Sequence, residues 1–259
     1  MHKILSQILE AKKERIEVLK KNIDALTALQ HNVPSPVSFK SAIRRPGKIS
    51  FIAEIKQASP SAGVLRKDFA HMELARSFAE SGVNAISVVT EEDFFLGKVN
   101  FIEDIKKEIR LPVLRKDFIL DTVQILESRV AGADAVLLIM AALDQEKLKK
   151  LYAYAKELGM DVLVEVHTEN ELKKALSLGA DIIGVNNRNL HTFQVSLESS
   201  HKLLAFIPDD VVKVSESGIN SRKDVLLLKG WRTDAVLVGE AIMKAHDVRE
   251  KINELHVDP

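Results

Sequence analysis

Short apolar runs alternate with longer amphipathic segments along most of the chain. Eight runs consist mainly of aliphatic residues, which is typical of parallel strands buried on both faces. We predict these strands at residues 49–55, 85–89, 112–115, 135–139, 162–166, 181–185, 211–215 and 235–238. Between them, apolar residues recur at helical spacing, as in segments 72–79, 123–130, 146–158, 169–178 and 222–228. The alternation indicates an α/β protein with a parallel sheet.

A helix end, a glycine and a strand follow one another three times, as SGVNAISV, AGADAVLL and LGADIIGV. Gly82, Gly132 and Gly179 suit the left-handed conformation that ends a helix before a strand. Their spacing of about 50 residues corresponds to two βα units of a barrel. A doubly wound open sheet is the alternative, but its GxGxxG fingerprint is absent. We therefore predict a (β/α)8 TIM barrel of the α/β class, formed as one domain by residues 1–259.

Residues 1–48 precede the first predicted strand and form an N-terminal helical extension. Ile16, Leu19, Ile23 and Leu26 lie on one face of a predicted helix, which ends before the Pro-Ser-Pro sequence at 34–36. Such a helix could plug the N-terminal end of the barrel or lie over the mouth at the opposite end. Periodicity does not distinguish these two positions.

Composition excludes several function classes. The 259 residues are 46% hydrophobic and contain 37 basic and 37 acidic side chains, so no basic excess points to nucleic acid or to a membrane surface. The lysines at 12–13 and 20–21 alternate with glutamates, which favours a solvated helix face. No cysteine, no signal-peptide core and no long apolar run occur, so we expect a soluble, cytoplasmic protein.

Polar residues collect at the ends of the predicted strands. Catalytic groups of such barrels lie at the C-terminal ends of the strands. One charged residue at a strand end is usually just solvated, but groups from six strands around one mouth indicate an acid–base site. The strand ends supply Glu54, Lys56, Lys116, Glu165, Asn186, Arg188, Glu216, Ser217, Gly218, Gly239 and Glu240.

Two further features refine this site. Ser217-Gly218 precedes a helix that Asn220 or Ser221 could cap, and Gly239 stands at a helix start, an arrangement typical of phosphate binding after the last two strands. Phe94, Phe95, Phe118 and Pro60 follow strand ends in the predicted loops, where they could pack a substrate ring or anchor the loops.

The motifs FIAEIKQASPSAG, VVTEEDFFLG, PVLRKDFILD, ADAVLLI, LVEVHTENEL, IIGVNNRNL, VSESGI and AVLVGEAIM follow the predicted strands in order. In these motifs the chain resembles the indole-3-glycerol-phosphate synthase family. The resemblance implies ring closure, decarboxylation and dehydration of 1-(2-carboxyphenylamino)-1-deoxyribulose 5-phosphate, with no cofactor. It covers all eight strands and the N-terminal extension.

The resemblance also implies individual roles. Lys116 is the general acid that protonates the substrate ketone, Glu165 serves the later proton transfers and Glu54 supports them. Lys56 holds a substrate carboxylate or phosphate, while Asn186 and Glu216 position hydroxyl groups and the lysines. The substrate-binding residues implied are Ser59, Pro60, Ser61, Phe95, Phe118, Arg188, Leu190, Ser217, Gly218, Leu237, Gly239 and Glu240. Some relatives have Ser at the position of Glu240, so its carboxylate must point away from a phosphate.

Two other functions are weighed against this one. A phosphoribosyl isomerase of the same barrel superfamily would share the phosphate loops, but the lysines on strands one and three and the lack of cysteine argue against it. A non-catalytic phosphate-binding barrel would be expected to lose some polar strand ends, and none is missing. The eight histidines show no paired ligand spacing, so we expect no metal. We expect a monomer, with a weak dimer as the alternative.

Overall fold

The computed structural model describes residues 3–189, 192 and 194–257, whose strands form a closed barrel in the order β1-β10-β9-β8-β7-β6-β5-β4. Every neighbouring pair is parallel. Closure confirms the predicted barrel and excludes an open, doubly wound sheet. The strands are β1 (Ser50–Ile55), β4 (Ala85–Val89), β5 (Val113–Lys116), β6 (Ala135–Ile139), β7 (Asp161–Val166), β8 (Ile182–Asn186), β9 (Val212–Glu216) and β10 (Ala235–Val238).

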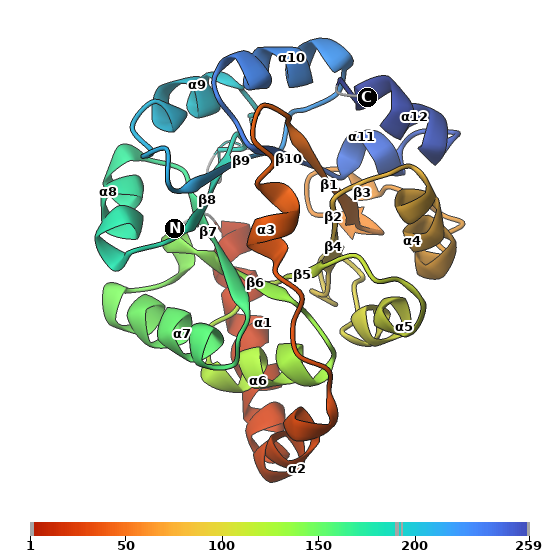
Figure 1. Cartoon of the computed structure of the whole chain (residues 1–259). Helices are drawn as coiled ribbons and strands as arrows, with labels where there is room; N and C mark the ends of the chain where they lie inside the picture. The colour runs from red at the N-terminus through yellow and green to blue at the C-terminus, as the bar shows by residue number, and fades with distance from the viewer. Residues whose placement is uncertain (1–2, 190–191, 193, 258–259) are drawn as a thin grey trace.

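Helices surround the barrel (Figure 1). Gly82, Gly132 and Gly179 have φ of +73°, +88° and +82°, which confirms the left-handed helix ends. A short antiparallel pair, β2 (Ala58–Ser59) and β3 (Gly63–Val64), lies in the loop after β1, and the 3-10 turn η2 (Met140–Ala142) follows β6. The surrounding helices are α4 (His71–Glu80), α5 (Asn100–Glu108), α6 (Thr122–Val130), α7 (Gln145–Glu157), α8 (Glu169–Leu178), α9 (Glu198–Leu204), α10 (Arg222–Gly230), α11 (Glu240–Met243) and α12 (Val248–Leu255).

Three strands extend one residue further than predicted. β5, β8 and β9 end at Lys116, Asn186 and Glu216, so these polar residues belong to the ladders: Lys116 pairs with Val89, and Asn186 pairs with Glu216. The apolar pattern stops before these residues because their side chains are polar: those of Lys116 and Asn186 line the mouth, and that of Glu216 is buried beside Lys116. The ladder therefore fixes the backbone of three predicted site residues.

The core consists of two layers. Aliphatic side chains such as Ile52, Leu114 and Leu163 fill the barrel interior, while a larger layer lies between the strands and the helices. Phe39 and Ile43 of α3 (Phe39–Ile43) are fully buried against the interior layer. Helix α3 therefore plugs the N-terminal end of the barrel.

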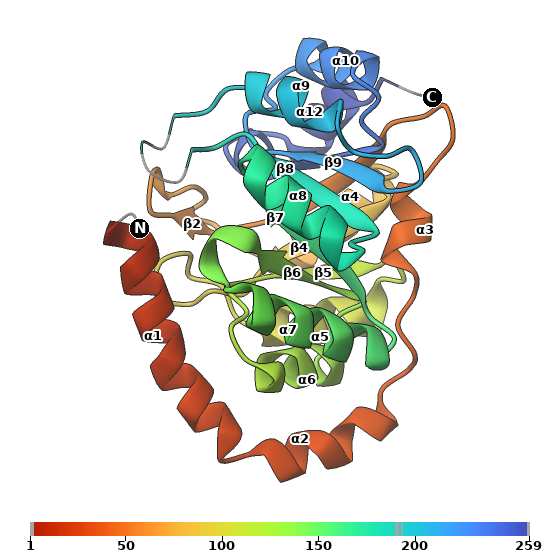
Figure 2. The ribbon, with the colours of Figure 1, turned by 90° about the vertical axis from the view of Figure 1, so that its left-hand side faces the viewer.

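The rest of the N-terminal extension lies at the opposite end. Figure 2 shows α1 (Lys3–Lys20) and α3 on opposite sides of the barrel, so one part of the extension covers the mouth and another part plugs the base. The prediction of one continuous helix is wrong, because α1 ends at Lys20 and α2 (Ile23–Leu29) begins a new helix before the 3-10 turn η1 (Gln30–Asn32).

The break in the extension has a local cause. The Asn22 side chain donates a hydrogen bond to the Val18 carbonyl at 3.4 Å, and asparagine favours such side-chain bonds over a helix interior. Beyond the break Ile23 is 43% exposed, so the predicted apolar stripe does not continue as one buried face. Across the described residues, no helix is both long and apolar enough to cross a membrane.

Candidate active site

A cavity of ≈ 290 Å³ opens at the carboxyl ends of the barrel strands. Glu216 lies behind its wall, and Leu190 lies outside the described residues. Phe94, a candidate for packing the substrate ring, is not among the lining residues, whereas all other residues of the implied catalytic and substrate-binding sets are. They are Glu54, Lys56, Ser59, Pro60, Ser61, Phe95, Lys116, Phe118, Glu165, Asn186, Arg188, Ser217, Gly218, Leu237, Gly239 and Glu240.

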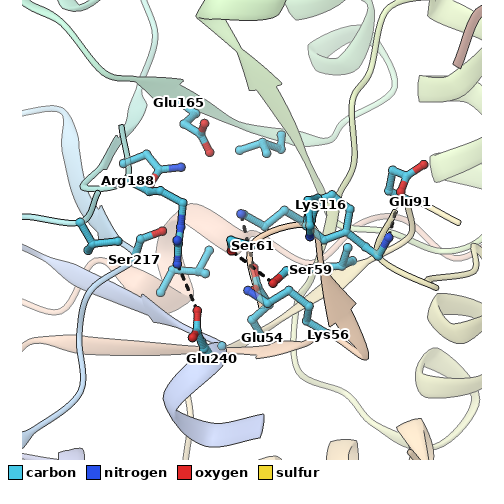
Figure 3. A pocket seen from close by; sticks show the side chains of 18 of the residues that line it. Glu54, Lys56, Ser59, Ser61, Glu91, Lys116, Glu165, Arg188, Ser217 and Glu240 are labelled. Carbon is cyan, nitrogen blue, oxygen red and sulfur yellow. Dashed lines mark hydrogen bonds and ion pairs between the residues drawn. The ribbon is translucent and has the colours of Figure 1, made fainter. Parts of the chain in front are cut away.

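Two lysines converge on one buried glutamate in this cavity (Figure 3). Lys56 Nζ lies 2.6 Å from Glu54 Oε1, and Lys116 Nζ lies 3.4 Å from Glu54 Oε2. Lys116 Nζ also lies 3.6 Å from Glu216 Oε2. Glu54 and Lys56 share a face because they are two residues apart on an extended backbone, as the sequence indicated.

The charges around Lys116 change its proton affinity and that of its neighbours. Burial would lower the pKa of Lys116, but the carboxylates of Glu54, Glu216 and Glu165 outweigh it and raise the pKa. Burial would raise the pKa of Glu54, yet Lys56 and Lys116 bring that pKa down to about 2. Lys116 is therefore a cation and Glu54 an anion throughout the neutral range.

Glu216 behaves in the opposite way. Burial, reinforced by the neighbouring Glu165, raises its pKa to about 8, although Lys116 opposes the shift. A methyl group on Gly184 would collide with Glu216 Oε1, and one on Gly239 would collide with Glu54 Oε1. These two glycines make room for the buried carboxyl groups. The site therefore holds one ionised and one protonated glutamate beside the same lysine.

Glu165 faces the cavity from β7, and a histidine lies behind it. His167 Nε2 is 3.4 Å from Glu165 Oε1, and His167 Nδ1 is 3.5 Å from Glu171 Oε2 on α8. The Glu171 side chain also accepts a hydrogen bond from the His167 backbone N–H at 2.6 Å. Glu165 thus belongs to a row of three titratable side chains.

The opposite part of the cavity is apolar. Phe95 and Phe118 place their ring centroids 6.3 Å apart at an angle of 42°. Residues 90–99, between β4 and α5, form the Phe95 loop. This loop is held by the buried Glu91, whose side chain accepts hydrogen bonds from the backbone N–H groups of Phe94 at 2.7 Å and Phe95 at 3.1 Å. The remaining apolar lining includes Ile4, Leu5, Ile8, Pro60, Leu137, Ile139 and Leu237.

The loops after β9 and β10 form the third part of the site. Ser217 and Gly218 have φ of +68° and +79°, and Ser221, not Asn220, caps α10. Glu240 lines the cavity, and its carboxylate lies 3.1 Å from Arg188 Nη2 and 2.6 Å from Lys244 Nζ. That this carboxylate points away from a bound phosphate stays a prediction.

Helix α1 is fixed across the mouth by ion pairs. Lys12 was expected on a solvated face, but its Nζ is buried 2.7 Å from Asp117 Oδ1, directly after Lys116. The alternating charges predicted a solvated face for all these lysines, and the prediction is wrong for Lys12 because its side chain faces the barrel. Arg15 pairs with Glu92 and, at 2.8 Å, with Asp93 in the Phe95 loop. The helix is therefore a wall of the cavity.

Comparison with known proteins identifies the family. The family model described as "Indole-3-glycerol phosphate synthase" matches residues 5–255. This chain belongs to the indole-3-glycerol phosphate synthase family. The indole-3-glycerol phosphate synthase of Endomicrobium trichonymphae is 47% identical, with 97% of this chain and 99% of the relative aligned. That of Acetivibrio thermocellus is 46% identical, with 97% and 98% aligned.

The fold has a wider distribution than the family. The 3-hexulose-6-phosphate synthase of Salmonella typhimurium superposes with a TM-score of 0.65 over 80% of this chain and 96% of its own, at 18% identity. At that identity the likeness is one of fold alone. The eight-stranded barrel is therefore shared with proteins of other names, and the family rests on the sequence relatives.

Several residues of the site could not be found, or were not found, from the sequence. His167 could have been found, because it lies two residues after Glu165 at the same strand end. Ile4 and Ile8 have the i, i+4 spacing of one helix face. Lys12 and Glu91 gave no such signal, since each is recognisable only by its buried partners.

Proposed function

We propose that this chain forms indole-3-glycerol phosphate, CO2 and water from 1-(2-carboxyphenylamino)-1-deoxyribulose 5-phosphate, and that it needs no cofactor. The family match and the names of the relatives support the activity. The main structural support for this activity is the position of Lys116, which lines the cavity beside the carboxyl groups of Glu54 and Glu216. A cation held there suits an acid that must donate to a ketone oxygen.

In the first step, Lys116 protonates the ketone oxygen as the ring carbon bearing the carboxylate attacks the ketone carbon. The raised pKa of Lys116, which the three nearby glutamates sustain against burial, keeps the proton available until the oxygen becomes basic. Loss of CO2 then returns the electron pair of the broken C–C bond to the ring. The apolar wall around Phe95 and Phe118 favours the loss of a charged carboxylate as neutral CO2.

In the last step, a hydroxyl leaves as water and the adjacent methylene loses a proton. We assign Glu165 as the acceptor of that proton, because its carboxylate lines the cavity on the side facing Lys116 (Figure 3). Glu54 holds both lysines in place, Asn186 orients the substrate hydroxyls, and Glu216 orients Lys116. Lys56 binds the substrate carboxylate or phosphate.

The remaining lining residues divide by chemistry. Phe95, Phe118, Pro60 and Leu237 form the slot for the aromatic ring. The phosphate lies against the backbone N–H groups of Gly218, Gly239 and Glu240 and near the hydroxyls of Ser59, Ser61 and Ser217, with Arg188 at the rim. The pairing of the Glu240 carboxylate with Arg188 and Lys244 reduces its repulsion of a phosphate.

We further propose that residues 1–259 form one domain with residues 1–48 as its extension, and that it acts as a cytoplasmic monomer. The cavity supports the monomer, because a single chain supplies all the groups that the reaction requires. The absence of cysteine is compatible with the cytoplasm.

The activity is tested with purified protein and the substrate, without added cofactor, by following indole fluorescence. We expect turnover by the wild type and a loss of about 10²-fold or more in kcat for Lys116→Ala. Lys149→Ala, on the exposed face of α7, is the control and should retain full activity. An inactive wild type contradicts the function, whereas a fully active Lys116→Ala contradicts only the acid role.

A further inference from the structure

Behind Glu165, away from the cavity, the row of titratable side chains leads toward solvent. His167 contacts Glu165 at 3.4 Å and Glu171 at 3.5 Å through its two ring nitrogens. The exposed fraction of the side chains rises from 3% at Glu165 to 11% at His167 and 20% at Glu171. Glu165 lines the cavity, but His167 and Glu171 are not among its described lining residues.

The proposed reaction requires such a connection. One proton goes to the ketone oxygen and a second goes to the departing hydroxyl, while Glu165 takes one proton from the methylene. CO2 leaves without a proton, so each turnover takes up one proton overall. Before the next turnover the acid regains the two protons it has given, and Glu165 releases the one it has taken. A substrate bound in the cavity would cover Glu165 from the front, and Glu165 itself has almost no exposed surface.

We propose that His167 and Glu171 form a proton path from Glu165 to bulk water behind the cavity. The inference rests on the role of Glu165 proposed above. His167 Nε2 accepts the proton from Glu165, and the proton on Nδ1 passes to Glu171 Oε2, which exchanges it with water. Only N–H and O–H bonds form and break, and the starting tautomer is restored when the two ring nitrogens exchange their protons with water. His167 acts through Glu165 and is therefore a positioning and relay residue.

The charges around the ring suit a proton carrier. Burial lowers the pKa of His167, but Glu171 on α8, Glu165 on β7 and Glu216 on β9 together raise it above its usual value. An imidazole can both accept and release a proton, and the raised pKa favours acceptance of the proton from Glu165. Burial raises the pKa of Glu171, but its bonds to His167 outweigh burial and lower it, so Glu171 returns protons readily to water.

A purely structural histidine explains less of this arrangement. The first turn of α8 is already capped by Thr168, whose hydroxyl accepts from the Glu171 N–H at 3.2 Å, and the His167 backbone N–H bonds the Glu171 carboxylate. The ring is not required for either bond. Both ring contacts are slightly longer than hydrogen bonds, as is common for catalytic contacts before substrate binds.

The test compares His167→Gln and Glu171→Gln with Glu169→Gln, an exposed glutamate of the same helix turn. We expect His167→Gln to lower kcat about tenfold at unchanged KM, less than the ~10²-fold loss for a direct acid–base group. Its solvent deuterium isotope effect on kcat should rise, and added imidazole should restore activity to His167→Ala. Glu171→Gln, which still offers an oxygen to the His167 N–H, should show the same kcat loss, and Glu169→Gln none.

Three results overturn the path: unchanged kcat in both His167→Gln and Glu171→Gln, a rise in KM at constant kcat, or no rescue of a folded His167→Ala by imidazole. Should His167→Gln fail to fold, Glu171→Gln alone decides. Glu165→Gln separates the two proposals. If it stays active, the assigned role of Glu165 fails. If it is inactive while His167→Gln turns over normally, only the path fails.

Discussion

The ion pair between Lys12 and Asp117 ties the N-terminal helix to the strand that carries Lys116, and Lys12→Met tests it. The substitution keeps an unbranched side chain of similar length but removes the ammonium group that lies 2.7 Å from Asp117 Oδ1. Both side chains are almost fully buried, so water cannot replace the lost charge at low cost. We expect a lower free energy of unfolding and weaker packing of α1 across the mouth.

The size of the expected loss of stability depends on the partners that Asp117 retains in Lys12→Met. Removing one partner of a buried ion pair costs about 3–5 kcal/mol. Asp117 retains Arg115 at 3.1 Å, the Thr90 hydroxyl at 2.7 Å and the Phe118 N–H at 2.8 Å. We therefore expect the lower end of that range, about 3 kcal/mol, which corresponds to a fall in Tm of about 6–12 °C for a chain of this size.

The pH dependence of this loss has a definite sign. Burial would raise the pKa of Asp117, but Lys12 and Arg115 lower it to about 2. A carboxyl group with a lowered pKa adds stability above the unfolded value of about 4 and loses it as pH falls toward 2. The difference between wild type and Lys12→Met should therefore be full at neutral pH and shrink in acid.

The assay is thermal unfolding by circular dichroism, paired with steady-state kinetics. KM should rise in Lys12→Met because Ile4, Leu5 and Ile8 of α1 line the cavity. The matched control is Lys13→Met, whose exposed pair with Glu10 contributes less than about 1 kcal/mol. Equal Tm values for the two variants would refute the predicted loss of stability. A lower Tm of Lys12→Met at unchanged KM would refute the link between this ion pair and the position of α1 at the mouth.

Two further predictions use the same methods. Because burial and Glu165 raise the pKa of Glu216 to about 8, the wild type loses stability as pH rises through the window from about 4.3 to 8. Glu216→Gln should therefore unfold at a higher Tm than the wild type at pH 8.5 and show no gain at pH 5, and a constant difference would contradict the shift. Glu91→Ala removes the acceptor of the Phe94 and Phe95 N–H groups, so kcat/KM should fall about tenfold, the equivalent of one charge-assisted bond. An unchanged kcat/KM would show that the Phe95 loop keeps its position without Glu91.

The barrel could be predicted because its signals are local. Aliphatic runs such as residues 135–139 pack on both faces, and Gly82 and Gly179 end helices, so each unit carries its own pattern. The cavity lining followed from one topological rule, which brings the C-terminal ends of all strands together. Lys116 and Asn186 could be placed at the mouth without any knowledge of their partners.

Pairings between distant segments could not be predicted. Lys12 and Asp117 are far apart in the sequence, and nothing distinguishes Lys12 from the exposed Lys13 except the side of the helix that faces the barrel. For the same reason, the sequence could not show that α3 of the N-terminal extension closes the base of the barrel while α1 lines the mouth. Phe39 fills the base of the barrel and Leu5 lines the mouth, and only the path of the chain around the barrel separates them.

The hydrogen bonding of buried side chains supports the placement of the chemistry. Native interiors pair nearly all buried polar atoms, so an unpaired one needs an explanation. Within the described part of the chain, Glu54 Oε2, both oxygens of Glu216 and both ring nitrogens of His167 accept or donate no hydrogen bond, although ion-pair contacts surround Glu54 and His167. Groups left with unused hydrogen-bonding capacity beside Lys116 and Glu165 are those that a substrate and a moving proton would use.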